Sequence, residues 1–244
     1  MMKPYVVGID IGGTNTVFGI VDARGQVVAS DSIKTMKHAD FDDYVDELHD
    51  NLSRLLKANE MEDKIQGIGI GAPNGNYYTG EIVNPPNLPW GPRIPLAEKV
   101  SKAFNGIPVA VTNDANAAAL GEMTYGAARG MKDFIMITLG TGVGSGIVIN
   151  GQLVYGSDGF AGELGHVIVK RNNGRICGCG RTGCLETYCS ATGVARTARE
   201  FIEIRKEPSL LRDLPPEEIT SKDVYDAAVA GDKISKEIFE YTGK

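Results

Sequence analysis

The first half of the chain alternates short apolar runs with amphipathic helix patterns. Runs bounded by glycine, proline or asparagine predict buried strands, and apolar side chains at Phe41, Val45, Leu48 and Leu52 mark one face of a helix. Asp40 is a suitable N-cap for that helix. The predicted strands are Tyr5–Ile11, Thr16–Val21, Gln26–Ile33, Ile65–Gly71 and Ile107–Thr112; the predicted helices are Phe41–Leu56, Leu96–Phe104 and one opening at Asn113. This order predicts an α/β lobe.

The pattern then restarts. Phe134–Leu139 is a second apolar run that ends in a glycine-rich turn, and another strand follows at Ile147–Ile149. The segment Ile9–Thr14 (IDIGGT) corresponds to Ile137–Gly142 (ITLGTG), and further along the chain Gly25–Val28 (GQVV) corresponds to Gly151–Val154 (GQLV). We interpret this as an internal duplication of two lobes, the alternative being coincidence between two glycine-rich turns.

The second lobe is shorter than the first in this pattern. After a cluster of cysteines the chain shows only helical periodicity, near Ala191–Ile204, Ser221–Val229 and Lys233–Tyr241. Counterparts of the fourth and fifth strands are missing, so we expect a second lobe truncated at its C-terminus. The predicted domains are residues 1–112 and 113–244.

Composition narrows the class of protein. A hydrophobic content of 42% is that of a globular domain, and a net charge of -6 is unfavourable for binding nucleic acid. No apolar run is long enough to cross a bilayer, and Met1–Pro4 leads directly into a strand without a signal-peptide pattern. We therefore expect a cytoplasmic protein that binds neither membrane nor nucleic acid, and we interpret the acidic helices Glu47–Lys57 and Glu217–Asp226 as solvated surfaces.

Three of the four cysteines lie close together, at Cys177, Cys179 and Cys184. Thiolates at this spacing can converge on zinc, which takes four nitrogen and sulfur ligands in structural sites. His166 is the preferred fourth ligand and Cys189 the competitor. Ordinary buried thiols are the alternative, and disulfides are disfavoured in the cytoplasm.

The two glycine-rich turns are candidate phosphate sites. Successive backbone N–H groups in such turns bind anions, and Thr14 and Thr141 can add hydroxyl donors. Neither turn has the sequence of a Walker P-loop. Two turns in equivalent places favour a nucleoside triphosphate, with Asp10 holding magnesium through water. The alternative for Asp10 is a turn-capping role.

Asp114 is the candidate general base. It lies where a strand ends and a helix begins, within an apolar segment, and phosphoryl transfer to a hydroxyl needs one positioned carboxylate to take the proton. A helix N-cap is an equally reasonable role from sequence alone. The polar side chains that suit a polyhydroxylated substrate such as a sugar are Asn113, Asp114, Glu163, His166 and Glu186.

Together these motifs resemble the ROK family of sugar kinases over all 244 residues. The resemblance rests on Asp10–Thr14 (DIGGT), Gly71–Asn74 (GAPN), Asn87–Trp90 (NLPW), Asn113–Asn116 (NDAN), Leu139–Gly142 (LGTG), Gly162–His166 (GELGH) and the set Cys177, Cys179, Cys184 and Glu186.

The resemblance implies the actin-like ATPase fold of hexokinases and an ATP-dependent phosphorylation of a hexose, with glucose the expected substrate and Mg²⁺ the metal of ATP. It implies structural zinc on His166, Cys177, Cys179 and Cys184, within an insertion at residues 156–188. It makes Asp114 the base for the 6-hydroxyl and suggests a homodimer. The implied phosphate-binding residues are Asp10, Gly12, Gly13, Thr14, Asn15, Gly140, Thr141 and Gly142.

Other members of the family remain alternatives: a kinase for N-acetylglucosamine or N-acetylmannosamine, or a sugar-sensing regulator without turnover. The sequence also departs from the family pattern. Asn74 stands where the family usually has glycine, and no helix-turn-helix precedes Tyr5, which disfavours the repressor branch. The expected truncation removes a segment that holds adenosine in the family, which would weaken ATP binding.

Overall fold

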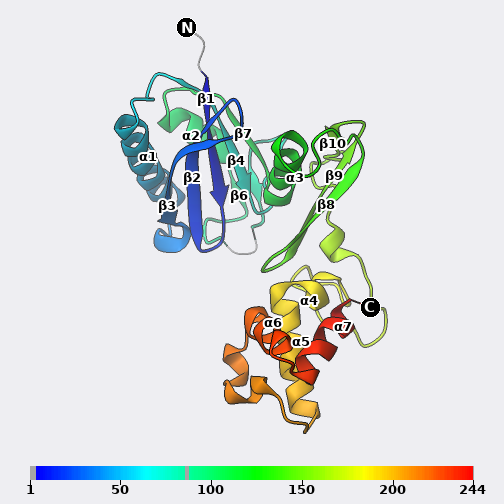
Figure 1. Ribbon diagram of the computed structural model, residues 1–244. Helices are drawn as coiled ribbons and strands as arrows, with labels where there is room; N and C mark the ends of the chain where they lie inside the picture. Colours follow the sequence, from blue (N-terminus) through cyan, green and yellow to red (C-terminus); the bar gives the residue numbers. More distant parts are fainter. Residues whose placement is uncertain (1–3, 86–87, 244) are drawn as a thin grey trace. The chain divides into compact units, whose positions relative to one another are not determined.

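The computed structural model describes residues 4–85 and 88–243 (Figure 1). Met1–Lys3, at the N-terminus, and Asn87, the first residue of the NLPW motif, lie outside the described residues. The chain forms two compact units, which are described separately. The first comprises Met1–Met136 and Gly146–Gly162, and the second Ile137–Ser145 and Glu163–Lys244.

The first unit is built on a five-stranded sheet in the order β3-β2-β1-β4-β7. β1 pairs antiparallel with β2, and β2 with β3, whereas β1, β4 and β7 run parallel. The strands are β1 (Tyr5–Ile11), β2 (Asn15–Asp22), β3 (Val27–Lys34), β4 (Ile65–Ala72) and β7 (Val109–Asn113). The carboxyl ends of the three parallel strands therefore meet at one edge, where ligands bind in α/β sheets.

The core of this unit lies between one face of the sheet and two helices, α1 (Phe41–Ala58) and α2 (Leu96–Ala103). Alternation along β1 buries Val7, Ile9 and Ile11 on that face. The Asp40 side chain accepts the N–H groups of Asp42 and Asp43, so the predicted N-cap is confirmed. A short 3₁₀ turn, η1 (Thr35–Lys37), precedes α1.

Helix α3 (Asp114–Tyr125) packs on the opposite face of the sheet, against β4 and β7 (Figure 1). A side chain added at Gly71 would lie 3.3 Å from the Ala117 Cβ and 3.5 Å from the Asp114 Cα. Glycine on the strand and alanine on the helix thus permit close packing, which brings Asp114 next to the sheet edge.

The segment between β4 and α2 contains the short pair β5 (Ile82–Val83) and β6 (Arg93–Ile94). Its Trp90 indole donates a hydrogen bond to the His38 carbonyl at 3.1 Å and packs on Tyr44, with ring centroids 4.4 Å apart. Asn84, Pro85 and Leu88–Pro92, which belong to a proline-rich stretch of this segment, form neither helix nor strand.

A second, three-stranded sheet has the order β10-β9-β8. Its strands are β8 (Phe134–Leu139), β9 (Val143–Ile149) and β10 (Gln152–Leu153). The order of strand, glycine-rich turn, strand and strand seen in β1–β3 is therefore repeated, which supports the duplication. β9 begins at Val143, earlier than the predicted Ile147, because the glycines of this stretch adopt extended backbone within the strand.

The second unit is mainly helical after residue 163, with the 3₁₀ turn η2 (Leu164–His166) at its start. Its core joins α5, α6 and α7 through residues such as Val194, Leu211 and Ile238. The remaining elements are α4 (Glu186–Cys189), α5 (Ala191–Ile204), η3 (Leu210–Asp213), η4 (Pro216–Glu218), α6 (Ser221–Val229) and α7 (Lys233–Thr242). In the part of the second unit after residue 163 that the structure describes, no strand is assigned beyond isolated bridges.

The compact units do not follow the expected division at residues 112 and 113. Helix α3 and the chain to Gly162, apart from residues 137–145, belong with the first unit because α3 packs on the five-stranded sheet. The predicted boundary between two lobes stays a prediction. Among the described residues, no helix combines the length and apolar character needed to cross a membrane.

Candidate active site and metal centre

The first set of candidate residues lies at the carboxyl edge of the five-stranded sheet. Asp10 on β1 is paired with Gly71 on β4, and Gly71 is paired with Thr112 on β7. Asp114 follows Thr112 by two residues and opens α3. A residue near the end of β1 and one just beyond β7 are therefore brought together, with only a glycine on the strand between them.

The N-cap of α3 is Asn113. Its side chain accepts the Ala115 N–H at 2.9 Å, and the Asp114 carboxylate accepts the same N–H at 2.8 Å through Oδ1. Asp114 is the first residue of the helix, where a negative charge interacts favourably with the helix dipole. Because Asn113 provides the cap, the carboxylate of Asp114 has a second oxygen for other chemistry.

The environment of Asp10 raises its pKa. Desolvation is the larger cause, and the negative charge of Asp114 is the second. The added Cβ at Gly71 would also lie within 4.0 Å of the Asp10 Oδ1, which shows how closely this edge is packed. A carboxylate whose ionisation is opposed in this way is a good partner for a cation, because a cation relieves both causes.

We predict that Asp114→Asn lowers the pKa of Asp10, although not to its ordinary value, because the desolvation remains. Asp114→Glu keeps the charge and serves as the control, with the Asp10 pKa still raised. Carboxyl ¹³C chemical shifts followed against pH measure both. In the wild type the folded chain retains the Asp10 proton to higher pH than the unfolded chain does. The contribution of Asp10 to the free energy of unfolding therefore falls as the pH rises from its pKa in the unfolded chain to its higher pKa in the folded chain. An unchanged Asp10 pKa in the Asn variant would contradict the charge coupling.

The first glycine-rich turn, Gly12–Asn15, joins β1 to β2. The Gly12 N–H donates to the Asn15 carbonyl at 3.0 Å, and a Cβ on Gly12 would lie 3.0 Å from that oxygen. The Thr14 carbonyl accepts the Thr35 N–H at 3.0 Å, and Lys34 Nζ donates to the Asn15 side chain at 2.8 Å. All the predicted phosphate residues of this turn therefore share the unit that holds Asp114.

The second unit contains the cysteine cluster. One ligand atom each from His166, Cys177, Cys179 and Cys184 lies within 4.8 Å of the others. The Cys179 and Cys184 sulfurs are 3.7 Å apart, and Cys177 Sγ is 3.5 Å from His166 Nδ1. Tetrahedral zinc with ordinary bond lengths places two sulfurs about 3.8 Å apart and a sulfur and a nitrogen about 3.5 Å apart. The donor set fits zinc, and Cys189 is not part of it.

The backbone of the cluster is shaped by tight turns. The Cys177 N–H donates to the Arg181 carbonyl at 2.9 Å, and the Gly180 N–H donates to the Cys177 carbonyl at 3.0 Å. Gly183 has a φ of 84°, and a Cβ there would lie 1.9 Å from the Lys170 carbonyl oxygen. Only glycine fits at position 183, so the turn between Cys179 and Cys184 requires this glycine.

The thiols do not all ionise readily without a cation. Burial raises the pKa of Cys177, and burial together with the neighbouring thiols raises that of Cys184 to about 12. Desolvation opposes ionisation of Cys179 as well, but hydrogen bonds from Arg181 and the other thiols outweigh it and lower its pKa to about 6. Because thiolates are the ligands, metal binding to this cluster would release protons.

Two candidate sugar-binding residues, Glu163 and Glu186, lie beside the cluster, and a third, His166, belongs to it. His166 directs Nδ1 to Cys177, and its Nε2 lies 4.0 Å from Glu163 Oε2. Cys177 Sγ also lies 3.8 Å from Glu186 Oε1. The cysteine cluster therefore contains or adjoins all three of these residues, Glu163, His166 and Glu186. The structure brings these residues together in the second unit, and Asn113, Asp114 and Asp10 in the first.

Comparison with known proteins shows the family to which the chain belongs. The sequence profile of the ROK family matches residues 6–244. The chain belongs to the ROK family. It is 40% identical to a glucokinase of Halalkalibacterium halodurans, over 99% of this chain and 73% of that protein, and 36% identical to a glucokinase of Thermotoga maritima, over 96% and 73%. A Streptomyces griseus ROK glucokinase, solved with glucose and AMPPNP, superposes with a TM-score of 0.77 at 34% identity, over 98% of this chain and 75% of that one. The actin-like ATPase fold is thereby confirmed.

One residue of this ROK chain that sequence reasoning missed is Arg175. Its buried guanidinium donates to the carbonyls of Thr187 (2.6 Å) and Gly193 (3.2 Å) and pairs with Glu200 at 2.5 Å. It also lies over the Tyr188 ring, 4.7 Å from the centroid. Arg175 thus joins the cysteine cluster to the helices after it, and an isolated arginine between glycine and isoleucine carries no sequence signal for this role.

We predict that Arg175→Met lowers the free energy of unfolding by about 3 kcal/mol, because buried partners of a charged group are left without it. The matched control is Arg196→Met, since Arg196 also pairs with Glu200 but is half exposed. We expect that control to change stability by less than about 1 kcal/mol. Chemical denaturation followed by circular dichroism measures both. Equal effects of the two variants would contradict the structural role of Arg175.

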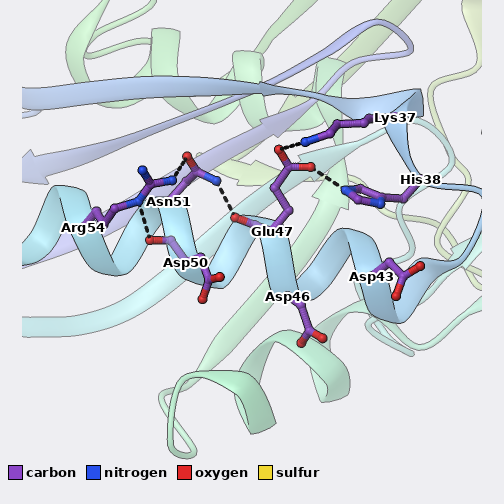
Figure 2. Close-up of a pocket in the computed structure, with 8 residues that line it drawn as sticks. All are labelled: Lys37, His38, Asp43, Asp46, Glu47, Asp50, Asn51 and Arg54. Atoms are coloured by element: carbon purple, nitrogen blue, oxygen red, sulfur yellow. Dashed lines mark hydrogen bonds and ion pairs between the residues drawn. The ribbon is translucent and has the colours of Figure 1, made fainter.

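A surface hollow along α1 lies outside both sets (Figure 2). Figure 2 shows Glu47 paired with two neighbouring side chains: it accepts from Lys37 at 2.8 Å and contacts His38 at 2.5 Å. The other lining residues are Asp43, Asp46, Asp50, Asn51 and Arg54. The hollow contains none of the candidate residues, and we assign it no function.

Proposed function

We propose that the chain is an ATP-dependent glucokinase that transfers the γ-phosphoryl group of ATP to the 6-hydroxyl of glucose. The observation that carries the assignment is the position of Asp114 at the sheet edge beside Asp10, in a chain of the ROK family. Its relatives named glucokinase, and the related structure with glucose and AMPPNP, support the same substrate pair.

In this proposal Asp114 accepts the proton of the 6-hydroxyl. The hydroxyl oxygen forms a bond to the γ-phosphorus as the bond from that phosphorus to the β–γ bridging oxygen breaks, so the products are glucose 6-phosphate and ADP. Most of the catalytic effect of such a site comes from positioning and electrostatics. Asn113 holds the first turn of α3 and thereby the backbone that carries Asp114.

The phosphates of ATP are assigned to the two glycine-rich turns. Residues Gly12–Asn15 and Gly140–Gly142 offer backbone donors, and Asp10 suits magnesium because its own ionisation is opposed until a cation is near. Magnesium bound with ATP supplies charge neutralisation on the phosphates.

Zinc is assigned to His166, Cys177, Cys179 and Cys184. The set supplies four ligands with no open position, so the metal would be structural and would fix the loop that carries Glu163 and Glu186. His166 could both bind zinc and bind a sugar hydroxyl. Its Nδ1 is directed at the cluster, which leaves Nε2, on the side of Glu163, for the sugar. The hydroxyl-binding residues would be Asn113, Asp114, Glu163, His166 and Glu186.

Substrate choice is tested by a coupled assay of ADP formation with glucose, N-acetylglucosamine and N-acetylmannosamine at equal concentrations. We expect glucose to have the highest kcat/KM. A higher kcat/KM with an N-acetylated sugar would assign the chain to the amino-sugar kinases. Sugar binding without ADP formation would assign it to the sensing regulators.

Two further assignments belong to this proposal. We place the chain in the cytoplasm as part of sugar metabolism, since all four cysteines are unpaired, which a reducing compartment favours. We also expect a homodimer, as the family resemblance suggests, with no nucleic-acid or membrane partner. Sedimentation equilibrium measures the oligomeric state, and a monomer at micromolar concentration would refute the dimer.

A further inference from the structure

The second glycine-rich turn is tied to the start of α5. The Gly140 carbonyl accepts the Ala191 N–H at 2.8 Å. The Thr141 carbonyl accepts the hydroxyl of Thr192 at 2.9 Å. Two consecutive carbonyls of the turn are therefore bound by two consecutive residues of the helix, which directly follows the cysteine cluster and α4.

A third tie comes from Glu186 on α4. Its Oε2 accepts the Val143 N–H at 2.9 Å. A Cβ on Gly142 would lie 2.5 Å from the same oxygen, so the carboxylate reaches the turn only because residue 142 is glycine. The turn is held from both sides, by α4 at its end and by α5 along its carbonyls.

The hydroxyl of Thr192 has a fixed role in this network. A carbonyl cannot donate, so the single proton of Thr192 goes to the Thr141 carbonyl. Ser190 lies 3.0 Å from the Thr192 oxygen and must therefore donate its own proton to Thr192. The Ser190 oxygen in turn accepts the Gly193 N–H at 3.0 Å and caps α5. This chain of hydrogen bonds orients the Thr192 hydroxyl before any ligand is present.

Within the described residues, no hydrogen bond uses the N–H groups of Thr141 and Gly142. The carbonyls of Gly140 and Thr141 are therefore bound by α5, whereas the N–H groups of Thr141 and Gly142 remain available to a ligand. Successive N–H groups of this kind bind anions. The arrangement is suited to phosphate oxygens, provided that the carbonyls stay where α5 holds them.

We propose that Thr192, together with Glu186, is a positioning residue for the phosphates of ATP. It keeps the glycine-rich turn Gly140–Gly142 in its anion-binding conformation in the absence of nucleotide. The proposal rests on the proposed kinase function, which assigns phosphates to this turn. Thr192 is exposed, and its hydroxyl is bonded to Ser190 and to the Thr141 carbonyl, so we assign its effect on the nucleotide to the turn.

The test compares Thr192→Val with Thr192→Ser in the 244-residue chain. The probe is AMPPNP with magnesium, titrated by calorimetry. Valine keeps the shape and loses the donor, and we expect a Kd about fivefold higher, the factor that corresponds to one ordinary hydrogen bond. Serine keeps the hydroxyl and is expected to restore the wild-type Kd. The KM for glucose should stay within twofold in both variants.

Thr124→Val is the matched control. Thr124 is an exposed threonine in α3, which belongs to the first unit, and its hydroxyl donates to the Leu120 carbonyl at 2.7 Å. We expect wild-type affinity for the nucleotide in this variant. An unchanged Kd in Thr192→Val, a loss that serine does not restore, or an equal loss in Thr124→Val would overturn the proposal.

Hydrogen exchange of the peptide that covers residues 139–146, without ligand, provides a readout independent of glucose phosphorylation. Exchange should be faster in Thr192→Val than in the wild type, and unchanged in Thr192→Ser. Unchanged exchange in Thr192→Val would overturn the proposal even in an active kinase. A wild-type chain that fails to phosphorylate glucose, yet shows these shifts in exchange and nucleotide affinity, would refute the proposed function and leave the role of Thr192 supported.

Discussion

Replacement of Asp114 by asparagine is expected to lower kcat for glucose phosphorylation by about a thousandfold, within the range of effects measured for general bases. The amide cannot take the proton of the 6-hydroxyl. Asparagine has nearly the same shape, and its oxygen can still accept the Ala115 N–H, so the fold of α3 should persist. Steady-state kinetics measure kcat, and calorimetry with glucose measures sugar affinity, which we expect to stay within about threefold.

The control for this variant is Asp31→Asn. Asp31 is an exposed carboxylate on β3, and its loss should leave kcat unchanged. If Asp114→Asn kept a tenth or more of the wild-type kcat, Asp114 would not be the base. If glucose affinity fell as steeply as kcat, the loss would come from hydroxyl binding, the other role assigned to Asp114, and not from proton transfer.

Loss of the metal is expected to have the largest effect on stability. The cluster joins residues from His166 to Cys184, and metal binding to such a site would contribute folding free energy. We predict that Cys179→Ser loses bound zinc and that its second unit unfolds roughly 20 °C or more below the wild type, as a loss of at least about 5 kcal/mol implies. Metal content by mass spectrometry and melting by calorimetry measure the two effects.

Cys189→Ser is the matched control, because Cys189 lies close in sequence but outside the group of four ligand atoms. It should keep one zinc per chain and a melting temperature near that of the wild type. Loss of zinc in Cys189→Ser, with retention in Cys179→Ser, would reverse the ligand assignment. A chelator-treated wild type that melts unchanged would exclude a structural metal.

Local sequence patterns predicted most of the elements. Tyr5–Ile11, Phe134–Leu139 and Ala191–Ile204 have the bounds that the structure shows, because each combines a clear hydrophobic pattern with a strong boundary signal. Ser190, for example, caps α5 through the Gly193 N–H. The turn at Asn74 adopts the positive φ of 53° that glycine would supply in the family pattern, so the substitution retains the turn.

Other features could not be read from the sequence because they depend on tertiary contacts. The short helix α4 has four residues, and no periodicity identifies it. Arg175 and Thr192 acquire their roles from the packing of the cluster against α5, which leaves no mark in residue spacing. The ROK family and its fold are confirmed by comparison, whereas the roles of Asp114, Glu163, His166 and Glu186 stay predictions until variants are measured.

The most direct test of phosphoryl transfer to the 6-hydroxyl of glucose is ³¹P NMR of the purified chain with magnesium, ATP and glucose. We predict that the γ-phosphate resonance of ATP is replaced by the resonances of ADP and of a phosphomonoester coupled to the two protons on carbon 6 of glucose. No phosphomonoester, a phosphate at another hydroxyl, or inorganic phosphate as the only new product would contradict it.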